Sequence, residues 1–161
     1  MSVLFWNVRG LGTAGRRSQI LEIIREPGVI VFCLQETIKA KFTHRELVSL
    51  GGSHSYHWAI KPTVGHSGGI LIAARDDIFD CIGASQVEFF LSMVVRNKIS
   101  KLQWEVMNVY GPVLHERKAE FLAEISDHVL TNDVPLVLGG DFNLIRFSGD
   151  RSRGLLHRTT M

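Results

Sequence analysis

The stretch Pro135-Leu136-Val137-Leu138-Gly139-Gly140-Asp141-Phe142-Asn143 decides how this chain folds and where its polar chemistry lies. A short apolar run that ends in two glycines is typical of a buried strand that stops abruptly. Asp141 and Asn143 follow the glycines, so the end of the strand carries a carboxylate and a carboxamide. Groups of this kind suit a hard cation and a phosphate.

A second stretch earlier in the chain has the same design. The apolar run 29–34 reads Val-Ile-Val-Phe-Cys-Leu and is followed by Gln35-Glu36-Thr37. A buried strand again ends at a carboxylate. Two such strand ends in one chain indicate a shared site.

The rest of the chain alternates strand-like and helix-like segments around these two stretches. The segment 113–130 is the clearest helix, and we expect Leu114, Phe121, Leu122, Ile125 and Val129 to share its core-facing side. This order favours a layered α/β or α+β domain, with sheets packed on each other and covered outside by helices. Strands are expected at 3–6, 29–34, 56–60, 69–74, 92–96, 101–110 and 136–138, and other helices at 14–26 and after the capping-box pair Thr43 and Glu46.

Bulk composition fits a single globular domain. The chain has 161 residues, 45% hydrophobic and 21% charged, with a net charge of only +2. That charge does not by itself demand a polyanionic partner, although arginines gather near both ends. No apolar run approaches the roughly 20 residues of a membrane span. Cys33 and Cys81 lack metal-ligand spacing, so we interpret both as buried thiols in a reducing compartment.

Polar side chains close four of the expected strands. They are Asn7, Glu36, Tyr110 and Asp141 with Asn143. Ligands gather where strand ends expose loops, so these groups are expected to converge at one edge of the packed sheets. Two carboxylates would repel there unless a divalent cation lies beside them. Mg²⁺ prefers few protein carboxylates together with phosphate oxygens, which matches this sparse set.

Five short motifs together resemble the endonuclease/exonuclease/phosphatase superfamily, and most closely the endonuclease domain of plant non-LTR (LINE-type) retrotransposons. The resemblance spans nearly the whole chain. It implies an α+β fold, a four-layer α/β-sandwich in which helices flank two packed β-sheets. The motifs are Trp6-Asn7-Val8-Arg9-Gly10-Leu11, Leu34-Gln35-Glu36-Thr37, Ser67-Gly68-Gly69-Ile70, Asn108-Val109-Tyr110-Gly111-Pro112 and Gly140-Asp141-Phe142-Asn143.

The resemblance also implies a role for each site residue. Glu36 would hold Mg²⁺ (Mn²⁺ is the other candidate ion), with Asn7 supporting the metal site. Asp141 would orient the attacking water or a protonated group, while Asn143 and Tyr110 would hydrogen-bond the scissile phosphate. The reaction is metal-assisted in-line displacement at phosphorus.

The resemblance further implies a DNA partner and an intracellular, nuclear location; it points to no protein partner and no membrane. Arginines near the two ends of the chain are the candidate contacts to nucleic acid. These candidates are Arg9, Arg16, Arg17, Arg151 and Arg153.

One feature of the family pattern is missing. The family completes its site with a later Ser-Asp-His element, whereas this chain ends at Met161 and its His157 has no adjacent Asp. We therefore expect residues 1–161 to form a single partial domain that lacks its final strands and is nearly inert as a nuclease. A non-catalytic nucleic-acid-binding remnant, and a phosphatase or lipid phosphodiesterase on the same scaffold, are the alternatives.

Overall fold

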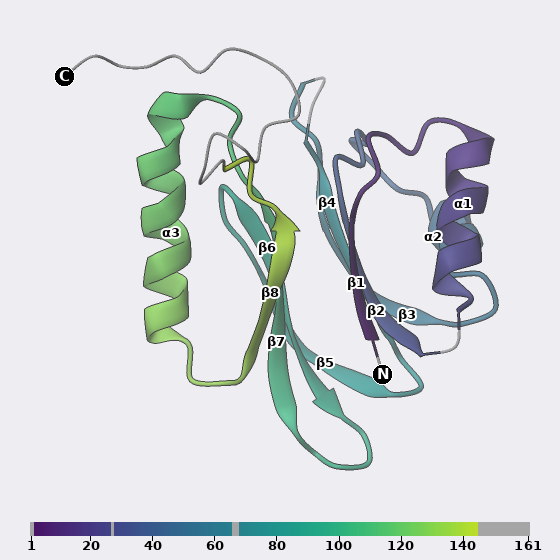
Figure 1. Cartoon of the computed structure of the whole chain (residues 1–161). Helices are drawn as coiled ribbons and strands as arrows, with labels where there is room; N and C mark the ends of the chain where they lie inside the picture. Colours follow the sequence, from purple (N-terminus) through teal and green to yellow (C-terminus); the bar gives the residue numbers. More distant parts are fainter. Residues whose placement is uncertain (1, 27, 66–67, 145–161) are drawn as a thin grey trace.

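The computed structural model describes residues 2–26, 28–65 and 68–144, and these residues form two packed β-sheets flanked by helices (Figure 1). In the first sheet the strand order is β1-β2-β4-β3, and in the second it is β5-β6-β7-β8. Helices α1 and α2 cover the first sheet and α3 covers the second, which gives the four layers expected of this α+β fold. The strands are β1 (Ser2–Asn7), β2 (Val29–Gln35), β3 (Tyr56–Lys61), β4 (Ile70–Arg75), β5 (Phe79–Gln86), β6 (Phe90–Asn97), β7 (Gln103–Tyr110) and β8 (Leu136–Asp141), and the helices are α1 (Ala14–Ile24), α2 (His44–Gly51) and α3 (Lys118–Thr131).

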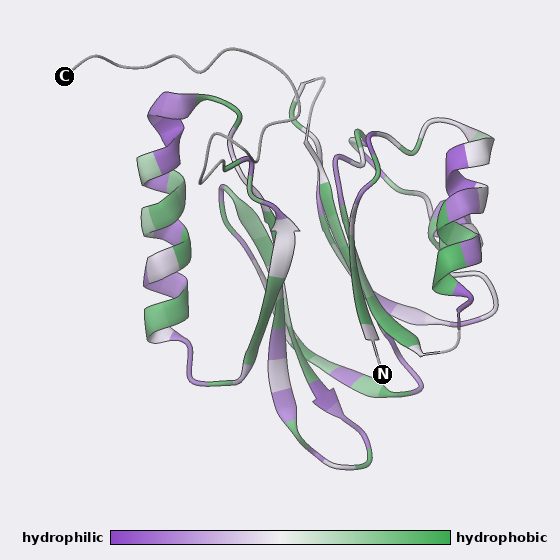
Figure 2. Cartoon of the chain, viewed as in Figure 1, coloured by the Kyte–Doolittle hydropathy of each residue, from purple (hydrophilic) through white to green (hydrophobic). Residues whose placement is uncertain are grey.

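The continuous apolar run of β2 reflects burial on both of its faces. Val31 and Cys33 point to the second sheet and belong to the core between the sheets. Phe32 and Leu34 point the other way and pack in the cluster that also holds Ile20 of α1. A strand covered on both sides needs apolar residues at every position, because successive side chains face opposite layers. Figure 2 shows how apolar residues dominate the central strands, whereas the helices mix apolar and polar residues.

Parallel pairing at two places brings the candidate residues to one end of the sandwich. Strand β1 runs parallel to β2, and Asn7 lies beside Gln35. Strand β7 runs parallel to β8, and Tyr110 lies beside Asp141. The carboxyl ends of these four strands therefore meet at the same end, where the sequence placed its polar groups.

The helix starts follow their capping residues. The Thr13 side chain accepts a hydrogen bond from the backbone N–H of Arg16, and Thr43 forms a full capping box with Glu46. Both interactions satisfy N–H groups that the first turn of a helix leaves unpaired. Within the described segments, no helix has both the length and the apolar character needed to cross a membrane.

The structure corrects several expectations about the elements. Strand β5 was not expected: of its residues only Phe79 is buried, and a register shift interrupts its pairing with β6. Strand β8 does not stop at the glycines but runs through both of them to Asp141. Cys33 is buried, and burial raises the pKa of its thiol, but Cys81 is exposed on the edge strand β5.

The helix that covers the second sheet is shorter than expected. A 3₁₀ turn spans His115–Arg117, and α3 begins only at Lys118. Phe121 alone is buried among the residues of α3, and the expected apolar side is only partly covered. About half of the surface of Leu122 and Val129 is exposed, and Leu114 lies outside the helix.

Candidate active site

Four polar side chains meet at the carboxyl ends of β1, β2, β7 and β8. The Nδ2 group of Asn7 donates to Oε1 of Glu36 at 3.0 Å and to Oδ2 of Asp141 at 2.8 Å. The hydroxyl of Tyr110 donates to the same Glu36 oxygen at 3.1 Å. One amide thus bridges two carboxylates from different sheets, and the expected convergence of these residues is observed.

The loop conformation at Glu36 fixes where its carboxylate lies. Glu36 has a positive φ of 52°, which is uncommon for a residue with a side chain. Its backbone carbonyl accepts a hydrogen bond from the N–H of Gly10 at 2.7 Å, and the N–H of Thr37 donates to the carbonyl of Gly69. The turn after β2 is therefore held from both sides, and the side chain of Glu36 is directed toward Asn7 and Tyr110.

A buried amide pair joins the two sheets directly behind this site. Nε2 of Gln35 donates to Oδ1 of Asn108 at 2.5 Å, and both side chains are almost completely buried. Nδ2 of Asn108 donates to the carbonyls of Leu34 and Leu71. Gln35 directly precedes Glu36, and Asn108 lies two residues before Tyr110. The bond between Gln35 and Asn108 therefore fixes the distance between Glu36 and Tyr110, which share a hydrogen bond. This role was not predicted from the sequence; its signal is that Asn108 follows Val106 by two residues and so shares the inward face of β7 with it.

Asn143 lies beside the cluster rather than within it. Its Nδ2 group donates to the carbonyl of Gly111 at 2.8 Å, and its backbone N–H donates to Oδ1 of Asp141. These bonds tie the turn after β8 to the loop after β7. In the described part of the chain, Asn143 makes no hydrogen bond with Asn7, Glu36 or Tyr110.

The structure gives the arginines of the first loop different surroundings. The guanidinium groups of Arg16 and Arg17 donate to the carbonyls of Val8 and Leu11, so both hold the loop after β1. Arg9 is exposed, and its backbone N–H donates to Oδ1 of Asn7, which orients the bridging amide. Arg151 and Arg153 lie outside the described residues.

The charge balance of the cluster suits a divalent cation. Within residues 2–26, 28–65 and 68–144, neither Glu36 nor Asp141 forms an ion pair with a basic side chain; neutral donors from Asn7 and Tyr110 hold them together. The same residues contain no group of three or more His, Cys, Asp and Glu side chains that could by itself hold a metal ion. A pair of carboxylates without nitrogen or sulfur ligands fits Mg²⁺, which takes its other ligands from water and substrate.

Tyr110 is expected to stay protonated far into the alkaline range. Burial, and then the nearby Glu36 carboxylate, raise its pKa from 10.0 to about 12. Because folding raises this pKa, the protonated hydroxyl contributes to the free energy of unfolding. This contribution is fully present below about pH 10 and is lost as the pH rises through about 12. Near-ultraviolet tyrosinate absorbance, compared with that of Tyr110→Phe, would report this titration. Titration of Tyr110 at or below its ordinary value would contradict this electrostatic account.

Known proteins show the same fold and family. A sequence profile of the Endonuclease/Exonuclease/phosphatase family matches residues 4–159. The chain is 26% identical over 159 residues to the Transposon TX1 uncharacterized 149 kDa protein of Xenopus laevis, an alignment that covers 94% of this chain and 12% of that protein.

Two solved structures extend this comparison. The human Nocturnin catalytic domain with a bound sulfate anion has a TM-score of 0.65 at 20% identity, covering 89% of this chain and 64% of that one. ANGEL2, a 2',3'-cyclic phosphatase in complex with adenosine-2',3'-vanadate, has a TM-score of 0.59 at 26% identity, covering 80% of this chain and 44% of that one. The chain therefore spans less than two thirds of the length of each of these relatives. The profile match over nearly the full sequence shows that this chain belongs to the Endonuclease/Exonuclease/phosphatase family.

Proposed function

We propose that the chain is the metal-binding part of a Mg²⁺-dependent phosphodiesterase that nicks DNA, of the kind that retrotransposons encode. The observation that carries this proposal is the Asn7 amide, which bridges Glu36 and Asp141 beside the hydroxyl of Tyr110. The similarity of the chain to a transposon protein of Xenopus laevis supports DNA as the substrate. That substrate would place the reaction in the nucleus.

Each residue of the cluster has a definite task in this proposal. Glu36 would hold Mg²⁺ (or Mn²⁺), which supplies Lewis-acid polarisation of a phosphoryl oxygen. Asn7 keeps the two carboxylates at a fixed separation, and its own oxygen is oriented by the N–H of Arg9. Asp141 orients the attacking water. Tyr110, protonated at neutral pH, would turn its hydroxyl from Glu36 to a non-bridging phosphate oxygen when substrate binds. Asn143 was expected to contact the phosphate as well, but its Nδ2 group bonds to the carbonyl of Gly111, so we assign it the task of fixing the turn that carries Asp141.

We further propose that residues 1–161 are part of a larger catalytic domain. In the described segments, no histidine hydrogen-bonds to Asn7, Glu36, Tyr110 or Asp141. His57 and His128 bind instead to the carbonyl of Phe79 and to Glu105. Because the described residues place no acid or base for the leaving oxygen, we expect DNA cleavage about 10²–10⁴-fold slower than in a complete site.

The leaving group therefore provides the test. Bis(p-nitrophenyl) phosphate releases a stable phenolate that needs no proton, so the chain should hydrolyse it measurably with Mg²⁺ or Mn²⁺ while nicking supercoiled plasmid barely at all. Glu36→Gln and Asp141→Asn should each remove the hydrolysis. Glu22→Gln, which removes an exposed carboxylate on α1, is the matched control and should behave like wild type.

Other outcomes would favour the alternatives. Hydrolysis that needs no metal, or that survives Glu36→Gln, would refute the proposed site. Faster release of phosphate from a 2',3'-cyclic nucleotide than of phenolate from the diester would favour a phosphatase, for which the similarity to ANGEL2 is the specific support. Binding of DNA with no hydrolysis of any substrate would favour a non-catalytic remnant.

A further inference from the structure

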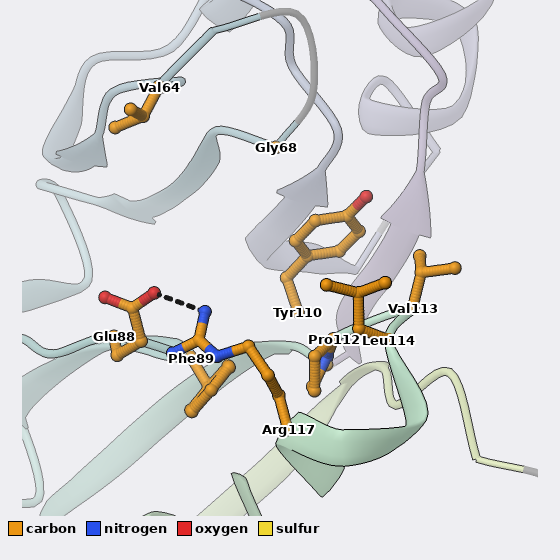
Figure 3. Close-up of a pocket in the computed structure, with 10 residues that line it drawn as sticks. Val64, Gly68, Glu88, Phe89, Tyr110, Pro112, Val113, Leu114 and Arg117 are labelled. Carbon is orange, nitrogen blue, oxygen red and sulfur yellow. Dashed lines mark hydrogen bonds and ion pairs between the residues drawn. The ribbon is translucent and has the colours of Figure 1, made fainter. Parts of the chain in front are cut away.

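The candidate site lies at the interface between the two sheets. Asn7 and Glu36 belong to the ends of β1 and β2 in the first sheet, whereas Tyr110 and Asp141 end β7 and β8 in the second. The bond from Nδ2 of Asn7 to Asp141 therefore crosses between the sheets, while the bond from the same nitrogen to Glu36 stays within the first sheet. The hydroxyl of Tyr110, on the side of its ring away from Pro112, crosses in the opposite direction (Figure 3). Whatever sets the distance between the sheets here also sets the distance between the two carboxylates.

One apolar contact lies directly behind the bond between Asn7 and Asp141. Side chains alternate along a strand, so Phe5 shares the inward side of β1 with Asn7, and Gly139 shares the inward side of β8 with Asp141. The ring of Phe5 lies so close to Gly139 that a Cβ there would fall 2.7 Å from three of the ring atoms. Cα atoms of β1 and β8 accordingly come within 8 Å of each other, whereas packed sheets usually lie about 10 Å apart.

The position of these two strands makes their contact decisive for the spacing. Within the described residues, β1 and β8 are edge strands, each paired on one side only. Phe5 lies between them with no side chain opposite it, and a packed interior is hardly compressible, so the thickness of one ring separates the strands at this point. Tyr110 does not set the distance in this way, because it lines an open cleft of about 360 Å³ and has room to move (Figure 3).

We propose that Phe5 is a positioning residue whose ring, packed on Gly139, sets the separation of Asn7 and Asp141 and thereby favours Mg²⁺ over Ca²⁺. The inference rests on the proposed function, because it concerns the cation that the site would hold. Mg²⁺ binds oxygen ligands at about 2.0–2.1 Å and Ca²⁺ at about 2.3–2.6 Å, so a short distance between the sheets suits the smaller ion. Any residue larger than glycine at position 139 would add its Cβ to the thickness of the ring.

Gly139→Ala tests the spacing without straining the backbone. The φ of Gly139 is not in the left-handed region, and the atoms nearest to the new Cβ all belong to the Phe5 ring. In the metal-free protein, the Nδ2 proton of Asn7 that faces Asp141 should lose its hydrogen bond, and its NMR resonance should move upfield. The other Nδ2 proton faces Glu36 within the first sheet, so its resonance should stay in place and serves as the internal reference.

A swap of the two side chains provides the rescue. Phe5→Ala alone should disturb the same Asn7 resonance, because the ring no longer holds the strands at their distance. The double variant Phe5→Ala with Gly139→Ala should restore the resonance, since two methyl groups then take the place of one ring. Gly83→Ala, whose Cβ would meet no atom within 4 Å, is the matched control and should resemble wild type.

Ion binding, followed at the same resonances, shows whether the spacing selects the cation. Mg²⁺ affinity should fall about 10-fold or more in Gly139→Ala, because changes in groups that support a metal site typically cost about 10–100-fold. Ca²⁺ affinity should fall less, since longer ligand distances suit the larger ion. The double variant should regain the preference for Mg²⁺.

Three results would overturn the inference. They are Asn7 resonances that stay unchanged in both single variants, equal losses of Mg²⁺ and Ca²⁺ affinity, as a merely structural role would give, and a double variant that is worse than either single one. If the wild-type resonances respond to neither ion while the upfield shift and its rescue are both observed, the proposed function fails and the spacing role of Phe5 stands.

Discussion

Gly140→Ala is expected to destabilise the protein by about 3 kcal/mol or more, enough to unfold much of it. A Cβ on Gly140 would lie 2.1 Å from the carbonyl oxygen of Val109 and 2.7 Å from the Val109 nitrogen. Both are backbone atoms of the paired strand β7, so neither can turn away. The φ of +135° adds strain for any residue with a side chain. Because Asp141 is the next residue, the candidate site should be lost together with the fold.

Urea unfolding followed by circular dichroism would measure this loss. Gly83→Ala is the matched control, because it lies in strand β5 and a Cβ there meets no atom within 4 Å. Its midpoint should stay close to that of wild type or rise slightly, since alanine restricts the unfolded chain more than glycine does. A Gly140→Ala protein with a wild-type midpoint would contradict the close strand approach described for β8.

Asn108→Leu is expected to cost about 2–4 kcal/mol of folding stability, because each buried polar group left without its partner costs about 1–3 kcal/mol. The Gln35 amide would lose its shorter hydrogen bond and keep only the one to the carbonyl of Cys33, and the carbonyls of Leu34 and Leu71 would each lose a donor. Thermal unfolding should show a clearly lower midpoint. Mg²⁺ binding should weaken as well, since the spacing of Glu36 and Tyr110 depends on this pair.

A double-mutant cycle tests whether the two amides act together. The double variant Gln35→Leu with Asn108→Leu should cost much less stability than the sum of the two single changes, because each single change already breaks the hydrogen bond that the two amides share. The matched control is Gln86→Leu, at the exposed end of β5, and it should change stability little. Additive effects would show that the two amides are not coupled across the sheets.

The candidate site could be predicted from the sequence because the chain marks its strand ends strongly. Asn7, Glu36 and Asp141 each follow an apolar run, and parallel pairing then brings such ends together. The resemblance to a known family supplied the expectation of two packed sheets flanked by helices, but not which strands pair. The continuous apolar runs of β2 and β4 also made these two strands predictable, because both are buried on both faces.

Other features depended on tertiary contacts that no local pattern reports. Strand β5 was missed because an exposed edge strand needs few apolar residues, and Phe79 alone anchors it. The glycines of β8 were read as a strand end, whereas Gly139 admits the ring of Phe5 and Gly140 the backbone of Val109. The loop-holding bonds of Arg16 and Arg17 could not be distinguished from exposed charges by sequence alone.

Mg²⁺ binding at the bridged carboxylates tests the central claim most directly. Side-chain amide resonances of Asn7, followed by NMR during a Mg²⁺ titration, report on a group within 3.0 Å of a Glu36 oxygen and 2.8 Å of an Asp141 oxygen. We predict saturable shifts at weak, about millimolar affinity. The shifts should disappear in Glu36→Gln and persist in the control Glu22→Gln. Shifts that are unchanged in Glu36→Gln, or a wild-type chain whose Asn7 resonances never respond to Mg²⁺, would contradict the assignment of this site as a divalent-metal centre.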